Sequence, residues 1–135
     1  MLWNIHVKNM ALIQEVDVEL STGLNILTGE TGAGKSIIIG AVNVALGAAG
    51  FKGFAREDAE YALVELIFSV ENEKIRRRLE ELEVPVEDGQ VIISRKLAKG
   101  RTISKINGET VTVSRIREAA EVLLDIHGQH EHQSL

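Results

Sequence analysis

The sequence predicts an α/β fold with one central helix, two peripheral helices and an antiparallel β arm. Several segments alternate apolar and polar residues, as strands of a half-buried sheet do. A glycine-rich octet at residues 29–36 stands between a short apolar run and a mostly apolar segment of helical length. Residues 73–83 repeat apolar side chains at helical spacing and are charged elsewhere, which is typical of a surface helix.

The order of elements follows from the same patterns. We expect strands at residues 2–8, 13–20, 24–28, 61–70, 91–97, 101–106, 109–111 and 123–126, and helices at residues 35–46, 73–83 and 114–122. Ser114 is the expected N-cap of the last helix, and Asn107-Gly108 is a strong signal for a two-residue hairpin. A break in the alternation at Gln14 indicates a bulge. Residues 127–135 are expected to form a polar loop.

Composition limits the classes of protein and of site. The chain has no cysteine, so disulfides and thiolate metal sites are excluded. Its most apolar stretch, residues 37–51, is interrupted and shorter than the ~18 apolar residues of a spanning helix, and the N-terminus lacks the layout of a signal peptide. The net charge of −5 argues against strong nonspecific nucleic-acid binding by the average surface. We expect a cytoplasmic protein without membrane contact and, because the chain stops within a predicted loop, a piece of a longer one.

The octet Gly29-Glu30-Thr31-Gly32-Ala33-Gly34-Lys35-Ser36 has the spacing of a phosphate-binding loop, Walker A. Its glycines let backbone N–H groups turn toward phosphate oxygens, and the helix that follows, from Ile37 on, adds the positive end of its dipole. Lys35 supplies a charge for the β- and γ-phosphates, and the Ser36 hydroxyl can ligate Mg²⁺. A glycine-rich turn without a ligand is the alternative, but the flanking strand and helix favour binding of ATP and Mg²⁺ at residues 29–37.

These residues and three further segments resemble the RecN family of bacterial DNA repair proteins, in the SMC-like branch of the ABC-type ATPases. Residues 23–39 resemble its Walker A region, residues 8–13 its first hairpin, residues 106–112 its INGxxVT hairpin, and residues 125–135 its segment after the last strand. The resemblance covers essentially the whole chain in order. The chain departs from the family pattern with Met10 for Phe, Gly40 for Asp, Ala48-Ala49 for a segment that often carries Arg, and Asp58 for the Gly that would follow Arg56.

The resemblance implies that residues 1–135 form the N-terminal half of an SMC-like ATPase head, a P-loop NTPase fold of the ABC/SMC head type. It implies four partners: ATP, DNA, the C-terminal half of the same head, and a second protomer whose signature motif closes over the nucleotide. In the full-length protein it implies ATP hydrolysis coupled to DNA double-strand break repair and recombination on the nucleoid. The signature motif, Walker B and catalytic Glu of the family are not in these residues. The chain alone is therefore expected to bind nucleotide weakly and to hydrolyse little.

Residues 127–133 have two interpretations besides a solvated loop. Nitrogen and oxygen ligands that suit Zn²⁺ are present at His127, His130, Glu131 and His132, although no cysteine assists and the spacing is not a helical i, i+4 pair. The resemblance implies instead a Q-loop, in which a glutamine amide oxygen reaches Mg²⁺ and the attacking water. Gln129 is the first candidate for this catalytic and metal-binding role, and Gln133 is the alternative.

A run of cations without an acid occupies the hairpin predicted at residues 91–106: Arg95, Lys96, Lys99, Arg101 and Lys105. On paired strands, residues two apart share a face, so two to four of these charges could line one side of the hairpin. We expect Lys99, Arg101 and Lys105 to contact DNA phosphates. The alternative is a solvated strand edge, on which lysines oppose aggregation.

Two other functions also fit the octet. One is another SMC-like or ABC-type head that serves as a nucleotide-dependent dimerisation module, and the other is a P-loop kinase or GTPase. A GTPase would need an Asn-Lys-x-Asp base-reading motif, which the sequence lacks. A kinase would need an acceptor site and lid arginines, which cannot be placed on this sequence. ATP turnover by a protein with both head halves would separate an ATPase from a dimerisation module.

Overall fold

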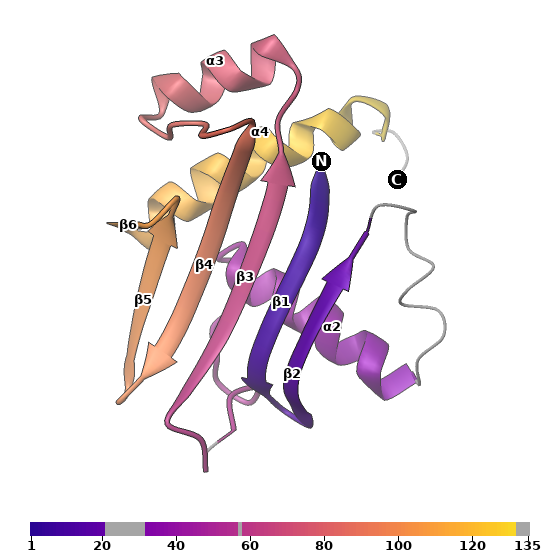
Figure 1. Cartoon of the computed structure of the whole chain (residues 1–135), viewed down its shortest axis with the longest axis vertical. Coiled ribbons are helices and arrows are strands. Elements are labelled where there is room, and N and C mark those ends of the chain that lie inside the picture. The colour runs from indigo at the N-terminus through magenta and orange to yellow at the C-terminus, as the bar shows by residue number, and fades with distance from the viewer. Residues whose placement is uncertain (21–31, 57, 132–135) are drawn as a thin grey trace.

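The computed structural model describes residues 1–20, 32–56 and 58–131, and of residues 32–35 and 125–131 it describes the backbone alone. A six-stranded antiparallel sheet in the order β2-β1-β3-β4-β5-β6 forms its centre (Figure 1). The strands are β1 (Leu2–Met10), β2 (Ile13–Glu19), β3 (Tyr61–Ser69), β4 (Gln90–Ala98), β5 (Arg101–Ile106) and β6 (Glu109–Val111). The helices are α2 (Gly32–Ala45), α3 (Glu73–Glu81) and α4 (Val113–Glu131). The strand expected at residues 24–28 lies outside the described residues.

α2 and α4 lie on one face of the sheet, which makes that face the core, and α3 lies beyond the end of the sheet where β3 ends and β4 begins (Figure 1). β3 alternates as a sheet strand with one buried face should, and its fully buried side chains are Ala62, Val64, Leu66 and Phe68. α2 contacts β1, β3 and β4 and buries Ile38, Ala41 and Val44, which are three residues apart. Each fully buried Val or Ile contributes about 1.5–3 kcal/mol. The sheet therefore sets the position of α2 and of the octet residues 32–36 at its start.

Both hairpin turns of the β arm are confirmed by backbone angles. Asn107 and Gly108 have φ values of 49° and 86°, and Lys99 and Gly100 have φ values of 54° and 75°. Two successive residues with positive φ are what a type I′ turn requires, and this turn matches the twist of the strands it joins. The Asn107 side chain adds order, because its Oδ1 accepts a hydrogen bond from the Ile92 N–H at 2.8 Å.

The bulge expected at Gln14 is wrong. β2 pairs with β1 in one continuous register, from Asn4 opposite Glu19 to Met10 opposite Ile13. The irregularity of the sheet lies instead between Leu2 and Asn4, where β1 meets β3. The break in the sequence pattern has a simpler cause: Ile13 stands at the start of an edge strand and is only half-buried, so its position there needs no shift in register.

The end of the chain also differs from expectation. α4 begins one residue before Ser114, and its cap is Thr112, whose Oγ1 accepts a hydrogen bond from the Arg115 N–H at 3.1 Å. Residues 123–126 and the start of the predicted loop are helical, because α4 continues to Glu131. The short apolar run at residues 123–126 suits a strand and a helix equally by its sequence. It is helical because Leu123 continues a helical stripe of buried side chains, Ile116, Ala119 and Ala120.

The structure explains the glycine at position 40, where the family pattern has Asp. A Cβ atom at Gly40 would lie 2.5 Å from both Cε1 and Cζ of Phe54. Phe54 packs against the edge of the core from the loop after α2. Because its ring occupies the space of a side chain at position 40, the aromatic contact and the family's Asp exclude each other in this arrangement.

Gly47, just past the end of α2, gives a prediction about stability. Its φ is +82°, and an added Cβ would lie 3.0 Å from Cγ of Arg117 and 3.2 Å from Cγ2 of Val113. Gly47→Ala should lower the free energy of unfolding by about 2–4 kcal/mol, since left-handed strain and overpacking add. Gly53→Ala is the matched control, because Gly53 has φ +85° with nothing within 4 Å. The control should cost about 1 kcal/mol. The free energy of unfolding can be measured by chemical denaturation. If both variants lost the same amount, overpacking against Arg117 and Val113 would not contribute.

Candidate nucleotide site and basic hairpin

The described part of the octet forms the first turn of α2. α2 begins at Gly32, inside the octet, so the unpaired N–H groups of its first turn belong to octet residues. Ser36 is exposed, Ile37 is half-buried and Ile38 is buried, so solvent reaches the hydroxyl expected to bind Mg²⁺. Gly29, Glu30 and Thr31 lie outside the described residues, as does the side chain of Lys35. The phosphate cradle stays a prediction.

The proposed Q-loop glutamines lie at the other end of the chain. Gln129 belongs to α4, so the expectation that residues 127–133 form a loop is wrong as far as Glu131. The side chain of Gln129 and the whole of Gln133 lie outside the described residues, and so do the side chains of His127, His130, Glu131 and His132. In the part of the chain whose side chains are described, no group of three or more His, Asp or Glu could hold a metal ion. The choice between Q-loop and metal cluster is therefore untested.

The basic hairpin β4–β5 presents four exposed cations, Lys96, Lys99, Arg101 and Lys105, and the last three are the ones expected to contact phosphate. The register pairs Lys96 with Ile103 and Ser94 with Lys105, so Lys96, Arg101 and Lys105 share the outer face, away from the helices. Ile103 lies between the two β5 cations on that face and is 46% exposed. Lys99 stands in the turn itself.

Arg95 does not belong to this surface, which corrects its place in the cationic run. It is 9% exposed and faces the core beneath the sheet. Its Nε donates to Ser104 Oγ at 3.1 Å, and its Nη1 donates to the Val44 and Ala49 carbonyl oxygens at 2.9 and 3.3 Å. A signal for this was in the sequence: period-two alternation from Val91 and Ile93 places residue 95 on the apolar face.

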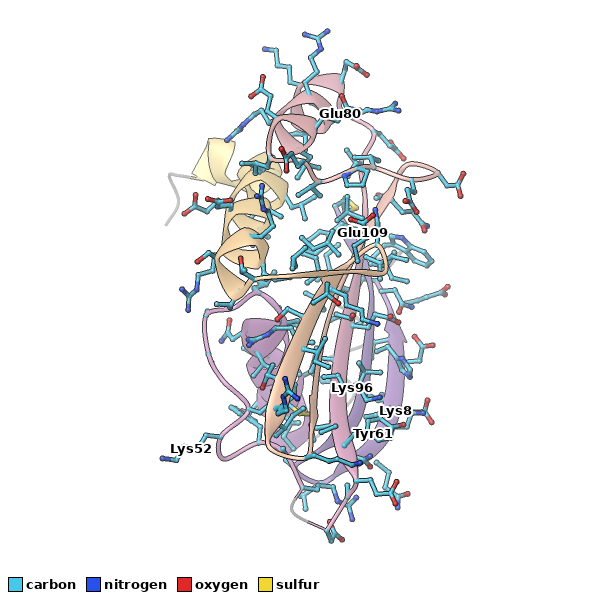
Figure 2. The ribbon with its side chains drawn as sticks, turned by 90° about the vertical axis from the view of Figure 1, so that its left-hand side faces the viewer. Lys8, Lys52, Tyr61, Glu80, Lys96 and Glu109 are labelled. Atoms are coloured by element: carbon cyan, nitrogen blue, oxygen red, sulfur yellow. The ribbon has the colours of Figure 1, made fainter. Side chains whose placement is uncertain are left out.

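The outer face also carries a contact that the sequence did not reveal. The Lys8 ammonium donates to Tyr61 Oη at 3.1 Å, and Lys96 Nζ lies 4.8 Å from the centre of the Tyr61 ring. Figure 2 shows these three residues together on neighbouring strands. The hydrogen bond to Tyr61, and then the charge of Glu15, raise the pKa of Lys8 above its usual value. Cation–π contacts of this kind hold lysine side chains against the sheet.

Charge changes sign across this outer face. The edge strand β2 contributes Glu15, Asp17 and Glu19, all exposed, whereas β4 and β5 contribute the lysines and arginine described above. His6 links the acidic side to the centre, since its Nε2 lies 2.8 Å from a Glu15 carboxylate oxygen. Part of the negative charge of the chain is thus concentrated on the β2 edge of the outer face, and the β4–β5 hairpin on the other side of the sheet is locally basic.

Arg56 lies at the end of the sheet where the β1–β2 and β4–β5 turns meet the loop before β3. It lines a shallow hollow together with Tyr61 and Lys99. Asp58, the residue that departs from the family pattern, pairs with it: Arg56 Nη2 and Asp58 Oδ2 are 3.4 Å apart. The Arg56 hydrogen bonds lower the pKa of the Asp58 carboxyl. Asp58 therefore offsets the charge of Arg56 locally.

Comparison with known proteins identifies the family. A family model described as an AAA domain matches residues 4–134. The chain belongs to the AAA domain family. DNA repair protein RecN of Halalkalibacterium halodurans is 40% identical over the whole chain, and RecN of Bacillus subtilis is 39% identical. The resemblance to RecN proteins is thus confirmed along the full length of the chain. The chain spans about a quarter of these relatives, 24% of each.

Solved structures confirm the fold class of this AAA-domain chain. An SMC ATPase structure, from work on ATP-driven dimerization and DNA-stimulated activation of such ATPases, matches with a TM-score of 0.70 at 22% identity. The match covers 91% of this chain and 79% of that one. An Smc head bound to the C-winged helix domain of ScpA matches with a TM-score of 0.62 at 21% identity, over 91% of this chain and 40% of that one. Among the described helices, none is long and apolar enough to cross a membrane.

Proposed function

We propose that this chain binds ATP with Mg²⁺ at residues 29–37 as the N-terminal part of an SMC-like ATPase head that acts in DNA repair. The observation that carries the proposal is the match to RecN repair proteins over the whole chain, octet included. The entry of the octet into the N-terminus of α2 supports it, because a helix N-terminus favours phosphate.

The proposed chemistry divides the work between this chain and its partners. Lys35 neutralises the β- and γ-phosphates, Ser36 ligates Mg²⁺, and Gln129, or alternatively Gln133, positions the metal ion and the attacking water. Hydrolysis then requires the C-terminal half of the same head and the signature motif of a second protomer, closed over the nucleotide. The AAA-domain match and the SMC head fold support this division.

DNA is the second proposed ligand, and it lies against Lys99, Arg101 and Lys105. These three side chains are exposed, two of them on the face turned away from the helices, so a duplex could approach without disturbing the core. Phosphate contacts of this kind provide affinity without sequence preference, which suits repair of breaks at arbitrary positions. The full-length protein would couple ATP turnover to double-strand break repair and recombination on the nucleoid, in the cytoplasm.

The test is ATP turnover by the full-length protein that contains this chain, measured with and without duplex DNA. We expect Mg²⁺-dependent turnover that rises with DNA and with protein concentration, because two heads must meet. The 135-residue chain by itself should bind ATP weakly and turn over little. Turnover that is absent from the full-length protein, or that uses GTP in preference to ATP, would refute the proposal.

Ser36 and Gln129 should separate binding from turnover. Ser36→Ala should weaken Mg²⁺-dependent ATP binding, because it removes a metal ligand. Gln129→Ala should lower kcat more than it weakens ATP binding, since its amide acts on the attacking water. Both can be measured in the full-length protein by nucleotide titration and steady-state kinetics. Gln133→Ala is the matched control: a defect in kcat for that variant, with Gln129→Ala normal, would move the assignment to Gln133.

A further inference from the structure

Two arginines from different elements meet at the C-terminal end of α2. Arg95 of β4 donates to the Val44 and Ala49 carbonyl oxygens, as described above. Arg117 of α4 donates from its Nε to the Gly47 carbonyl oxygen at 2.9 Å. All three acceptors lie within six residues that include the last turn of α2 and the turn that follows it. We call Arg95 and Arg117 the arginine clamp.

The arginine clamp places a buried guanidinium at the C-terminal end of α2, which costs desolvation free energy. Burial, and to a smaller degree the Arg117 charge, lower the pKa of Arg95 below its usual value. Among the described residues, neither guanidinium has a carboxylate partner within ion-pair distance; their acceptors are carbonyl and hydroxyl oxygens. The negative end of the α2 dipole favours cations there, but apolar side chains often replace buried charges at no loss of stability. Stability alone therefore does not explain a buried Arg95.

The clamp joins three elements that carry the proposed function. α2 runs from the phosphate loop to the clamp, 14 residues or about 21 Å of helix. β4 carries Arg95 toward the core and the neighbouring Lys96 toward the outer, cationic face. α4 carries Arg117 near its start and Gln129 in its last turn. Contact at Gly47 is close, since an added Cβ would lie 3.0 Å from Cγ of Arg117.

We propose that Arg95 and Arg117 are positioning residues that tie the far end of the phosphate-loop helix to the DNA-facing hairpin and to α4, so that ATP turnover responds to bound DNA. The inference rests on the proposed ATPase function and names how its two ligands are coupled. DNA bound at Lys99, Arg101 and Lys105 loads the β4–β5 hairpin, and β4, which pairs with β5, also carries Arg95. Because Arg95 donates to the Val44 carbonyl of α2, the helix moves with the strand, and the octet residues 32–36 at its other end move with the helix.

The experiment uses the full-length ATPase and the variants Arg95→Met, Arg117→Met and the double variant. The measured quantity is the ratio of kcat with saturating duplex DNA to kcat without DNA. Each single variant should lower this ratio about fivefold or more, the usual size of a coupling between two sites. KM for ATP and Kd for DNA should stay within about twofold, because neither residue touches a ligand. The double variant should lower the ratio no further than the single variants do, since both substitutions remove the same connection between the hairpin and α2.

Controls separate positioning from folding. Arg77→Met removes an exposed α3 arginine whose side chain is 70% accessible, and it should leave the ratio unchanged. Arg95→Lys and Arg117→Lys keep the charge but lose the forked geometry, so they should restore part of the DNA response. If Arg95→Met fails to fold, the exposed Arg117 decides the question with its Met and Lys variants.

The outcomes distinguish the clamp from the proposed function. Folded methionine variants with the parent ratio would overturn the clamp and reduce both arginines to helix caps. Loss of kcat with and without DNA in equal proportion would do the same. A parent protein that binds ATP but does not respond to DNA would refute the coupling proposed for the whole ATPase, and the clamp with it.

Discussion

Lys35→Ala should remove ATP binding from the full-length protein while leaving its fold intact. Lys35 is the one side-chain cation of the octet, and a triphosphate brings several negative charges that need such a partner. Removing one partner of a desolvated charge pair costs about 3–5 kcal/mol, or roughly 10²–10⁴ in affinity. The measurement is ATP affinity by calorimetric titration, with circular dichroism to verify folding. Unchanged ATP affinity in a folded Lys35→Ala variant would refute the nucleotide site.

Lys52→Ala is the matched control for this variant. Lys52 is exposed in the loop after α2, and Figure 2 shows it pointing into solvent, away from the outer face of the sheet. The substitution removes the same charge from the same chain without touching the octet. ATP affinity should therefore stay at the parent value. A loss as large as that of Lys35→Ala would mean that net charge, rather than the cradle, governs binding.

Replacing Lys99, Arg101 and Lys105 with Ser should weaken DNA binding and flatten its dependence on salt. Each phosphate that a cation neutralises contributes about 0.9 to the slope of log affinity against log salt concentration. Three exposed cations should therefore account for roughly two to three units of that slope. ATP affinity should stay unchanged, because none of the three belongs to the octet. The slope can be measured by fluorescence anisotropy with labelled duplex DNA and the full-length protein.

The chain offers a control of equal charge on α3. Lys74, Arg76 and Arg77 are exposed, and Arg76 and Arg77 pair with glutamates of the same helix. Replacing these three residues with Ser changes the net charge by the same amount on a different surface. The salt slope should stay at the parent value. Equal slopes for both triple variants and the parent protein would make the β4–β5 hairpin a solvated edge and place the DNA path elsewhere.

Elements with one buried face could be predicted from the sequence because burial leaves a periodic trace. Apolar residues alternate along β3 and recur at helical spacing along α3. Asn107-Gly108 is a pair that favours the positive φ values found in its turn. The helix boundary at residues 123–126 could not be predicted, because four residues of apolar sequence suit a strand and a helix equally. The buried side of the preceding turns of α4, where Ile116 and Ala119 line up with Leu123, decides between them.

The sequence by itself predicted the chemistry of the candidate site, since the order Gly-x-x-x-x-Gly-Lys-Ser specifies donors and charge without reference to distant residues. It also determined the family, through motifs spread along the whole chain. Alternation along β4 indicated that Arg95 faces the core, but tertiary structure alone decided which groups bind its guanidinium there. Arg95 and Lys96 are neighbours of similar charge, but the pleat turns one toward α2 and the other toward solvent. The partners of Arg95, Val44 and Ala49, are some 50 residues away in the chain, so nothing local to β4 could reveal them.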